Sequence, residues 1–263
     1  MLLANSLMRV HRKFSTRLGL DVQTWITRSD PGAERLLQGL ASAGIAAICT
    51  PAVKIATLDP FELMLVGPGG RRALAQEELE GLLPDVIVVV SQHAAKRFKK
   101  YGLSAPEVPL LAIGAATAGV LGAGVLVARE ASSEGLLAEP ILKKVGLVWL
   151  VAGRDGRETI TDQLIQRGAR VVKILLYERQ AAKLPTLLPD EGDIIEIGSS
   201  FGLRVIHSQW PEARVGRGRI TLIVPSSRVA DEARLLGFAG VEIAASASVG
   251  DMVATIAAKI KGG

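Results

Sequence analysis

The sequence predicts an α/β protein with two parallel sheets, in which one domain is inserted into the other. Short apolar, β-branched runs alternate with helical patterns along the 263-residue chain, as expected for parallel sheets covered by helices on both faces. About ten such runs are present, which is many for one sheet. Two irregular stretches interrupt the alternation, and we interpret them as passages of the chain from one domain to the other.

Each apolar run is predicted to form one strand. The predicted strands are Thr24–Arg28, Ala46–Thr50, Val86–Val90, Leu110–Ile113, Val125–Ala128, Leu147–Val151, Val171–Leu176, Asp193–Ile197, Thr221–Val224 and Val241–Ala244. Helical patterns such as "AERLLQGLASAG" and "RETITDQLIQRGA" fill most of the gaps. Several helices should end at a glycine, because glycine readily adopts the left-handed conformation that stops a helix; these are Gly44, Gly102, Gly168 and Gly237.

The irregular stretches give the domain boundaries. The first is Ala52–Pro84, where "DPFELMLVGPGG" is interpreted as a loop or crossing, and the second is the polar, proline-marked stretch Tyr177–Pro189. We therefore expect a discontinuous first domain over 23–52 and 178–263, and an inserted domain over 53–177. Residues 1–22 form a basic extension, which we interpret as disordered or as an over-long start rather than as a transit segment.

Composition limits the classes of function. The net charge is +5, but Arg9, Arg12, Lys13 and Arg17 account for most of it, with no acid in residues 1–20. The nearly neutral remainder does not indicate nucleic-acid binding. The single cysteine, Cys49, excludes an internal disulfide and fits a reducing compartment, so we expect a cytoplasmic monomer. No apolar run is long enough to cross a membrane.

Three chemical motifs are weak. "GSSFG", Gly198–Gly202, has the pattern of a hydrolase nucleophile elbow, but the only later histidine is His207, which belongs to the same predicted helix. The serines there are better explained as helix caps. "VGPGG" and "VAGRDGRE" match no nucleotide-binding fingerprint, although Arg154 and Arg157 near a helix start would suit a carboxylate.

The sequence does not indicate a metal site either, because the histidines, His11, His93 and His207, are scattered and Cys49 has no partner at ligand spacing. We interpret His93, just inside a predicted helix, as a surface residue.

A stronger signal is shared by four hydroxyl residues. Ser91, Thr117, Ser199 and Ser227 all lie where a strand passes into a helix. In open α/β sheets, these carboxyl ends of strands face the ligand. The alternative is that each is simply an N-cap or first-turn residue of a helix, and both roles are compatible, because the N–H groups of helix starts bind carboxylates well. The pattern predicts a ligand with several negative charges.

The chain resembles the uroporphyrinogen-III synthase family from about Trp25 to Ile260. Five segments occur in the order of that family: "WITRSDPGAERLLQGLASAGIAAICTPAVKI", "DVIVVVSQHAAKRF", "LLAIGAATAGVLGAGV", "VWLVAGRDGRETITDQLIQRGARVVKILLYER" and "LIVPSSRVADEARLLGFAGVEIAASASVGDMVATI". Some positions depart from the pattern. "SQH" stands where the family often has serine, proline and asparagine, and "DIIEIGSS" carries Glu196 inside a strand and Gly198 where threonine is common. We expect Glu196 to point outward at a sheet edge.

The resemblance implies two flavodoxin-like domains, a two-stranded linker and an active site between the domains. It also implies the reaction: hydroxymethylbilane, a linear tetrapyrrole with eight carboxylates, loses its terminal hydroxyl as water. Ring D is then inverted through a spiro intermediate, and the macrocycle closes to uroporphyrinogen III. No cofactor and no metal are implied.

The resemblance assigns Tyr177 as the catalytic residue, donating a proton to the departing hydroxyl or orienting it. It assigns the binding of substrate carboxylates to Arg28, Ser91, Gly114, Thr117, Ser199, Ser226 and Ser227. No nucleic acid or membrane partner is expected, and a transient contact with the preceding pathway enzyme is left open. The alternative function is a non-enzymatic two-domain hinge-type protein that binds a small anion.

Overall fold

The structure, a computed structural model, describes residues 22–105, 107–156, 158–186, 189–210 and 220–262. The basic extension predicted over residues 1–22, apart from Val22, lies outside these ranges, as does Arg157. The chain divides into two compact units: unit 1 comprises Met1–Pro51 and Leu184–Gly263, and unit 2 comprises Ala52–Lys183. Each unit has its own sheet.

Unit 1 is built on a five-stranded parallel sheet with the order β12-β11-β10-β1-β2. The strands are β1 (Thr24–Ile26), β2 (Ala47–Cys49), β10 (Ile194–Glu196), β11 (Thr221–Val224) and β12 (Gly240–Ile243). Taken in chain order, this is the flavodoxin-like order, in which the first strand lies between the second and the third. The chain leaves unit 1 after β2 and returns before β10, so unit 2 is an insertion.

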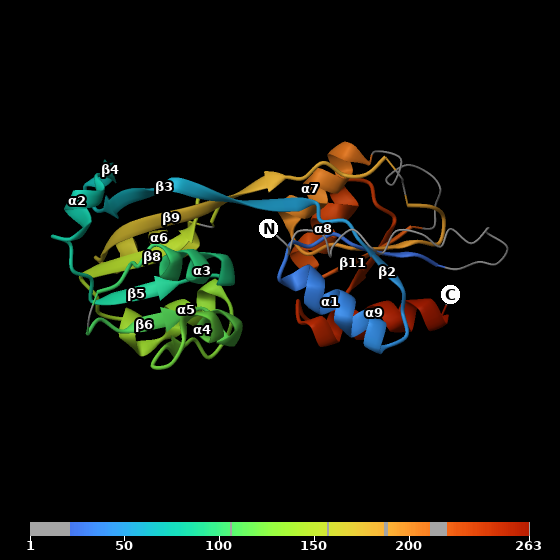
Figure 1. Ribbon diagram of the computed structural model, residues 1–263, viewed down its shortest axis with the longest axis horizontal. Coiled ribbons are helices and arrows are strands. Elements are labelled where there is room, and N and C mark those ends of the chain that lie inside the picture. Colours follow the sequence, from blue (N-terminus) through green and yellow to red (C-terminus); the bar gives the residue numbers. More distant parts are fainter. Residues whose placement is uncertain (1–21, 106, 157, 187–188, 211–219, 263) are drawn as a thin grey trace, which may run out of the picture. The chain divides into compact units, whose positions relative to one another are not determined.

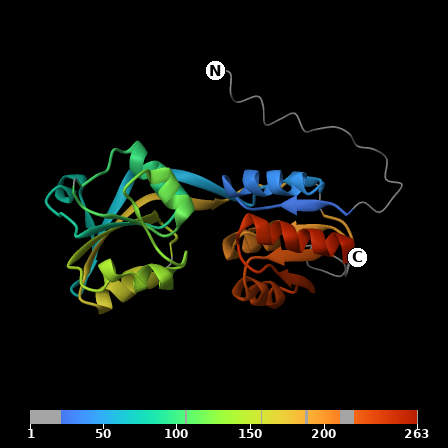
Figure 2. The ribbon, with the colours of Figure 1, turned by 90° about the horizontal axis from the view of Figure 1, so that it is seen from below.

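Helices cover both faces of this sheet. They are α1 (Gly32–Ser42), α7 (Ser200–Gln209), α8 (Ser227–Leu235) and α9 (Val249–Gly262). Helices α1 and α9 lie side by side on one face, and α7 and α8 lie on the other (Figures 1 and 2). On the α1 side, Leu36 and Leu40 pack with Ile194, Met252 and Ile256 in a fully buried core. The amphipathic pattern that predicted α1 is therefore explained by this contact.

Unit 2 contains a seven-stranded sheet with the order β4-β3-β9-β8-β5-β6-β7. Its strands are β3 (Val53–Gly67), β4 (Gly70–Leu74), β5 (Val86–Val89), β6 (Leu110–Ala112), β7 (Leu126–Val127), β8 (Leu147–Gly153) and β9 (Arg170–Ala181). Strand β3 is antiparallel to β4 and β9, and the other pairs are parallel. From β7 to β9, the parallel strands follow the other common doubly wound order, in which the first strand lies between the second and the fourth.

Two cores lie on the two faces of this sheet. The helices of unit 2 are α2 (Gln76–Leu79), α3 (Gln92–Lys100), α4 (Ala115–Leu121), α5 (Ser133–Ala138), the 3₁₀ turn η1 (Pro140–Leu142) and α6 (Thr159–Gln166). Helix α3 packs on one face through Ala94, Ala95 and Phe98. Helices α5 and α6 pack on the other, where Leu136 and Leu164 are fully buried.

The predicted loop in "DPFELMLVGPGG" is wrong. Residues 53–67 form one long strand, and the following glycines make a tight hairpin into β4, with Gly67 opposite Gly70. Pro60 misled the prediction, because proline cannot donate to a ladder. It is tolerated because β3 changes register between Thr57 and Glu62, so no ladder bond is required there.

The helix-ending glycines were predicted correctly. Gly44, Gly102, Gly168 and Gly237 have φ values of 75°, 63°, 87° and 88°, in the left-handed region.

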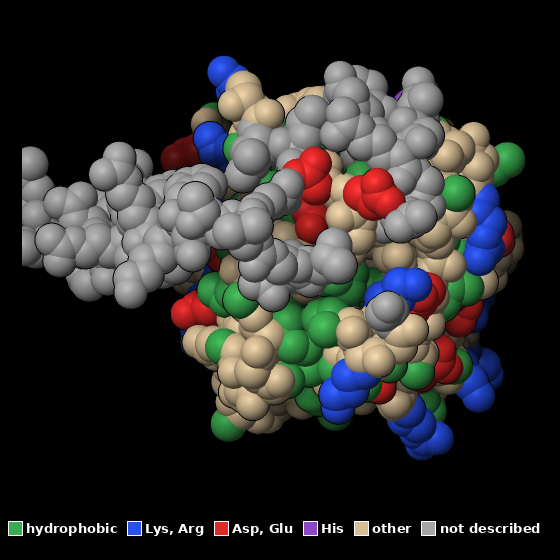
Figure 3. All heavy atoms as spheres, turned by 90° about the vertical axis from the view of Figure 1, so that its right-hand side faces the viewer, with side chains coloured by type: hydrophobic (Ala, Val, Ile, Leu, Met, Phe, Trp, Pro, Cys, Tyr) green, Lys and Arg blue, Asp and Glu red, His purple; other side chains and the backbone are tan. Residues whose placement is uncertain are grey.

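Among the residues described, none of the helices has the length and apolarity needed to span a bilayer. In the lower right part of the face shown in Figure 3, lysine and arginine side chains lie beside aspartate and glutamate side chains, so the two signs of charge are mixed there.

Candidate functional site

The order of the parallel strands reverses in unit 2 between β5 and β8. Strand β5 leads to β6 on one side, and β8 leads to β9 on the other. In open α/β sheets, ligands bind outside the carboxyl ends of the strands at such a switch point. Ser91 follows β5 as the N-cap of α3, and Gly153 is the last residue of β8. The fold alone therefore indicates these two positions.

Tyr177 of β9 lies at this point. Its side chain is buried, with 3% of the residue exposed, and its hydroxyl lies 3.0 Å from the Ser91 hydroxyl. Ser91 Oγ also accepts a hydrogen bond from the Ala94 N–H at 3.0 Å, as an N-cap does. The two hydroxyls carry two protons and use one in their mutual bond, so the pair retains one O–H donor for a ligand.

A cationic side chain lies over the tyrosine ring. The guanidinium carbon of Arg97 is 5.5 Å from the ring centroid, within the range of a cation–π contact. Arg97 Nε donates to Thr57 Oγ1 at 3.0 Å, and Thr57 is the residue opposite Tyr177 in the β3–β9 pair. Burial lowers the pKa of Arg97, while the charges of Tyr177 and Tyr101 act to raise it. The guanidinium stays protonated in either case.

His93 is not the surface residue that the sequence suggested. It is half-buried, and its ring lies 5.6 Å from the Tyr177 ring, centroid to centroid. The sequence places it correctly in the first turn of α3, but it gives no sign that α3 packs beside β9.

The second tyrosine has a different environment. The Tyr101 hydroxyl donates to the Leu58 carbonyl at 2.6 Å, and its ring packs edge-on against Phe61. Its donor is thus used by the backbone, a common arrangement for tyrosines packed against a core. Of the two tyrosines in the sequence, only Tyr177 has its hydroxyl hydrogen-bonded to another hydroxyl. This difference supports a chemical role for Tyr177.

Unit 1 has its own switch point, between β1 and β10, and a buried ion pair occupies it. Glu196 is fully buried on a central strand, so the prediction that it points outward at an edge is wrong. Its carboxylate binds the Arg28 guanidinium, with Nε at 2.7 Å and Nη2 at 2.6 Å, and accepts from two backbone N–H groups. The charge of Arg28, predicted to bind substrate, is therefore compensated within the protein.

Gly198 makes this arrangement possible. A Cβ at position 198 would lie 2.7 Å from the Arg28 Cβ, closer than real contacts allow. The glycine at this position, a departure from the family pattern, and the buried Glu196 thus belong to the same local arrangement.

The strand-end serines of unit 1 lie at helix starts, and one of them, Ser199, caps its helix through the side chain. Ser199 Oγ accepts from the Gly202 N–H at 3.2 Å, and His207 lies in the same helix, α7, so the "GSSFG" motif has the geometry of a cap. Ser226 is the N-cap of α8 without a side-chain cap bond, and Ser227 is exposed at its first position. Arg228 Nη1 donates to Ser200 Oγ at 2.8 Å, which adds a cation to this edge.

The two remaining predicted residues lie at the start of α4. Gly114 is the N-cap, and a Cβ there would lie 3.0 Å from the Ala131 Cβ. Thr117 is only 4% exposed, so its hydroxyl is not offered at the surface of unit 2, and its contact with substrate stays a prediction.

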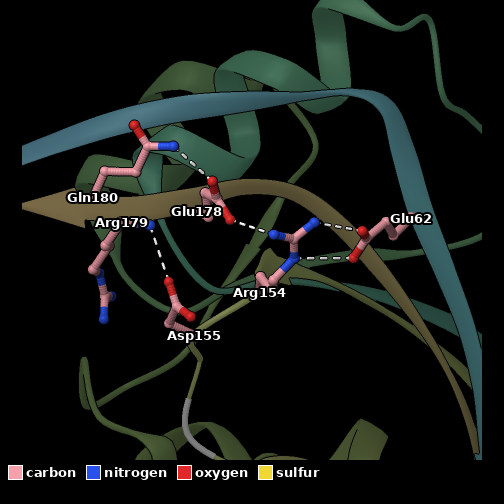
Figure 4. Close-up of polar contacts among 6 residues, drawn as sticks. All are labelled: Glu62, Arg154, Asp155, Glu178, Arg179 and Gln180. Atoms are coloured by element: carbon pink, nitrogen blue, oxygen red, sulfur yellow. Dashed lines mark hydrogen bonds and ion pairs between the residues drawn. The ribbon is translucent and has the colours of Figure 1, made fainter.

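The carboxylate site expected at Arg154 and Arg157 is not available at Arg154. Its guanidinium already binds Glu62 and Glu178 (Figure 4), while Arg157 lies outside the described residues.

The structure thus brings together Ser91 and Tyr177 of the predicted residues, and it leaves Gly114 and Thr117 at a neighbouring strand end. Sequence reasoning missed His93, Arg97, Gly153 and Arg228 as neighbours of these groups. Arg228 directly follows the predicted serines and Arg97 lies one turn after His93, so their positions held a weak signal.

Comparisons with known proteins agree with this architecture. The family model described as uroporphyrinogen-III synthase HemD matches residues 34–254. A solved uroporphyrinogen-III synthetase from Helicobacter pylori is 13% identical with a TM-score of 0.61, the match covering 91% of this chain and 99% of that one. A mutant uroporphyrinogen III synthase from Thermus thermophilus is 15% identical with a TM-score of 0.55, covering 92% and 100%. None of these matches supports the hinge-type binding protein. The chain therefore belongs to the uroporphyrinogen-III synthase family, the cyclising lyases of haem biosynthesis.

Proposed function

We propose that this chain cyclises hydroxymethylbilane to uroporphyrinogen III with Tyr177 as the proton donor. The observation that carries the assignment of Tyr177 is its buried hydroxyl, 3.0 Å from Ser91 at the switch point of unit 2. Loss of the terminal hydroxyl as water requires one proton, and a phenol near pKa 10 in its ordinary state holds a proton at neutral pH.

The proton balance follows from the hydrogen bonds. Either hydroxyl can donate in the Ser91–Tyr177 bond, and the proposed step uses the arrangement in which Ser91 donates to the phenol oxygen and the phenol O–H is directed at the substrate. When the C–O bond breaks, its electron pair stays on the departing oxygen, and the phenol proton completes the water molecule. The carbon left behind is stabilised by the adjacent pyrrole nitrogen. The phenolate keeps the Ser91 hydrogen bond and faces the Arg97 charge, both of which stabilise it.

Ring closure returns the proton. The electron-deficient carbon is attacked by the ring D carbon that already carries the bridge to ring C, which forms the spiro intermediate. The bond between that ring D carbon and the bridge carbon then breaks, and the ring C pyrrole nitrogen stabilises the bridge carbon that is left electron-deficient. The other α-carbon of ring D attacks this bridge carbon, which closes the macrocycle with ring D inverted, and loses its proton to the phenolate. The products are then uroporphyrinogen III, water and a neutral tyrosine, so atoms and charges balance. The protein contributes a donor and a folded pose for the substrate.

We assign the substrate carboxylates to the strand-end groups of the two sheets. Ser91 and Gly114 belong to unit 2, and Ser199, Ser226 and Ser227 belong to unit 1, where Arg228 adds a positive charge. Hydrogen bonds to charged groups contribute about 1.5–3 kcal/mol each, so several moderate contacts suffice. We include Arg28 in the carboxylate-binding set because its pair with Glu196 lies at the strand ends of unit 1. We include Thr117 because it lies in the first turn of α4.

We propose a cytoplasmic location and a transient contact with the enzyme that supplies the bilane. The lone cysteine fits a reducing compartment. Direct transfer would protect a linear substrate that closes spontaneously to the wrong isomer.

The test uses purified protein and freshly prepared hydroxymethylbilane. The expected product is mainly the type III isomer, separated from type I by chromatography after oxidation to porphyrin. Product that remains type I as the protein concentration is raised would defeat the assignment, because the spontaneous reaction gives only that isomer.

A further inference from the structure

Tyr177 lies at a bulge that changes the direction of its side chain. The pairing of β9 passes from Leu175 to Tyr177 without Leu176, both toward β3 and toward β8. In an unbroken strand, neighbouring side chains point to opposite faces of the sheet. Leu176 and Tyr177 instead pack into one core cluster with α3. The bulge therefore turns the phenol toward Ser91, and bulges beside active sites commonly redirect a side chain in this way.

The turn after β8 supplies contacts where the regular ladder is interrupted. The Arg154 N–H donates to the Tyr177 carbonyl at 2.7 Å. The Arg154 guanidinium binds Glu178, the next residue of β9, and donates from Nε to Glu62 Oε2 at 3.1 Å. Glu62 is the residue at which β3 resumes its pairing with β9. Figure 4 shows the guanidinium between these two carboxylates, so one side chain links the three strands around Tyr177.

This network is strongly charge-assisted. The hydrogen bond that Arg154 donates to Glu62 raises the pKa of Arg154; desolvation opposes this shift, and the charges of Glu62, Glu178 and Asp155 add to it. The Asp155 carboxylate accepts from the Arg179 N–H at 3.0 Å, and Gln180 donates to Glu178 at 2.7 Å (Figure 4). The first bond fastens Arg179 to the same turn, and the second, within β9, holds the Glu178 carboxylate that Arg154 binds.

Gly153 supplies the space that the tyrosine ring occupies. A Cβ at position 153 would lie 2.6 Å from Tyr177 Cε2 and 2.7 Å from Cζ, where carbon atoms normally stay about 3.5–4.0 Å apart. The ring is buried, so it has no solvent to move into. Gly153 does not have a positive φ, so its backbone conformation does not itself require glycine. A methyl group there would displace the ring by about 1 Å.

We infer that Gly153 and Arg154 are positioning residues of the cyclisation, which hold the Tyr177 hydroxyl against Ser91 from the turn after β8. The inference rests on the proposed role of Tyr177. Both residues act through the tyrosine, Gly153 by leaving room for its ring and Arg154 by fixing its backbone and the carboxylates beside it. A displacement of about 1 Å is enough to cost roughly 100-fold in turnover when a reacting group is misplaced.

A double-mutant cycle tests the inference. The variants are Gly153→Ala, Tyr177→Phe and their combination, with kcat, KM and melting temperature measured on hydroxymethylbilane. Gly153→Ala should lower kcat by about 10- to 100-fold and change KM by less than about threefold. Phenylalanine keeps the ring and its clash but has no hydroxyl to misplace. In that background the loss of melting temperature should therefore persist, while the further loss of kcat should fall below about twofold.

The matched control is Gly67→Ala, also at the end of a strand of this sheet. A Cβ there would meet only Arg170, with Cγ at 3.4 Å, so its kcat should stay within about twofold of the parent. Normal kcat in Gly153→Ala overturns the inference, as does an equal loss in both backgrounds. If Gly153→Ala does not fold, the same cycle is run with Arg154→Gln, where an equal loss in both backgrounds again overturns it. A normal kcat in Tyr177→Phe alone is a different result, because it removes the phenol from the proposed function itself.

Discussion

At the scale of single residues, what matters is how each functional group is surrounded. The two tyrosines differ because Tyr101 donates to a backbone carbonyl, whereas the Tyr177 hydroxyl is paired with a serine hydroxyl. Two arginines differ in the same way. Arg28 is neutralised by a buried carboxylate, whereas Arg97 faces an aromatic ring. Residue type alone distinguishes none of these cases.

Replacing Tyr177 by phenylalanine should separate chemistry from packing. The ring stays, so the free energy of unfolding should change by about 1 kcal/mol or less, the scale of one hydrogen bond. Turnover should fall roughly 10- to 1000-fold, the range for a general acid or a positioned donor. Steady-state kinetics and urea unfolding measure both quantities. Ser227→Ala is the control and should cost less turnover, because backbone N–H groups share the binding of carboxylates. Equal losses in the two variants would contradict the assignment.

The lone cysteine gives a prediction about pH. Cys49 is exposed, but partial desolvation by the surrounding protein raises the pKa of its thiol, and the charges of Asp30 and Glu196 raise it further. Only the thiolate reacts with alkylating agents, so a raised pKa means less thiolate at neutral pH and a rate that climbs only at higher pH. Iodoacetamide labelling, followed by mass spectrometry, should show a midpoint above that of the urea-unfolded protein. Asp30→Asn should lower the midpoint, and an unchanged or lower midpoint in the folded parent would contradict this reasoning.

At the scale of helices and strands, the sequence was most informative where burial is continuous. Strands β5, β8 and β11 are buried throughout and were predicted nearly to their ends. Strand β3 was missed because fewer of its residues are buried and Pro60 lies in its irregular part. The run Val171–Leu176 predicted β9, but the bulge at its end was not predictable. A bulge depends on what the neighbouring strands do, and a continuous apolar run contains no sign of it.

The candidate site was predictable to a similar extent. Strand-end serines follow from the parallel fold, and the tyrosine follows from the family resemblance. The partners of these residues come from elements far along the chain, as in the pairing of Tyr177 with Ser91 and of Glu196 with Arg28. Glu196 was misjudged because a carboxylate inside a strand is expected at an edge, where water solvates it. Here an arginine and two backbone N–H groups replace that water.

The ion pair between Arg28 and Glu196, which lies between the ends of β1 and β10, should be essential to the stability of unit 1. Glu196→Gln keeps the shape of the side chain but leaves the Arg28 guanidinium, whose side chain is 13% exposed, without its counter-charge. Breaking a buried pair from one side costs about 3–5 kcal/mol. Urea unfolding can be followed through Trp25 and Trp210, which pack together in unit 1.

The control for that change is Glu232→Gln, which removes an exposed pair with Arg204 in the same unit. It should cost about 1 kcal/mol or less. A similar small cost for Glu196→Gln would show that the buried pair contributes little beyond its shape.

At the scale of the whole chain, the insertion makes unit 2 continuous in the sequence and unit 1 discontinuous. Unit 2 is one continuous segment, and its two ends meet, because the Ala182 N–H donates to the Ala52 carbonyl at 3.0 Å. Unit 1 is assembled from two segments, and its central strand β1 lies between β2 of the first segment and β10 of the second. Only one of the two units can therefore form its core before the whole chain is present.

A fragment of residues 52–183 should therefore fold by itself. It contains all seven strands of its sheet and the cores on both faces, and its buried residues contact partners from the same segment. Domains of this size commonly bury enough surface to be stable alone. Cooperative thermal unfolding by circular dichroism and a dispersed amide NMR spectrum would be the expected result. The control is residues 184–263, which should stay unfolded because α9 lacks α1 and β10 lacks β1. A fragment 52–183 without cooperative unfolding would show that unit 2 depends on the rest of the chain for its stability.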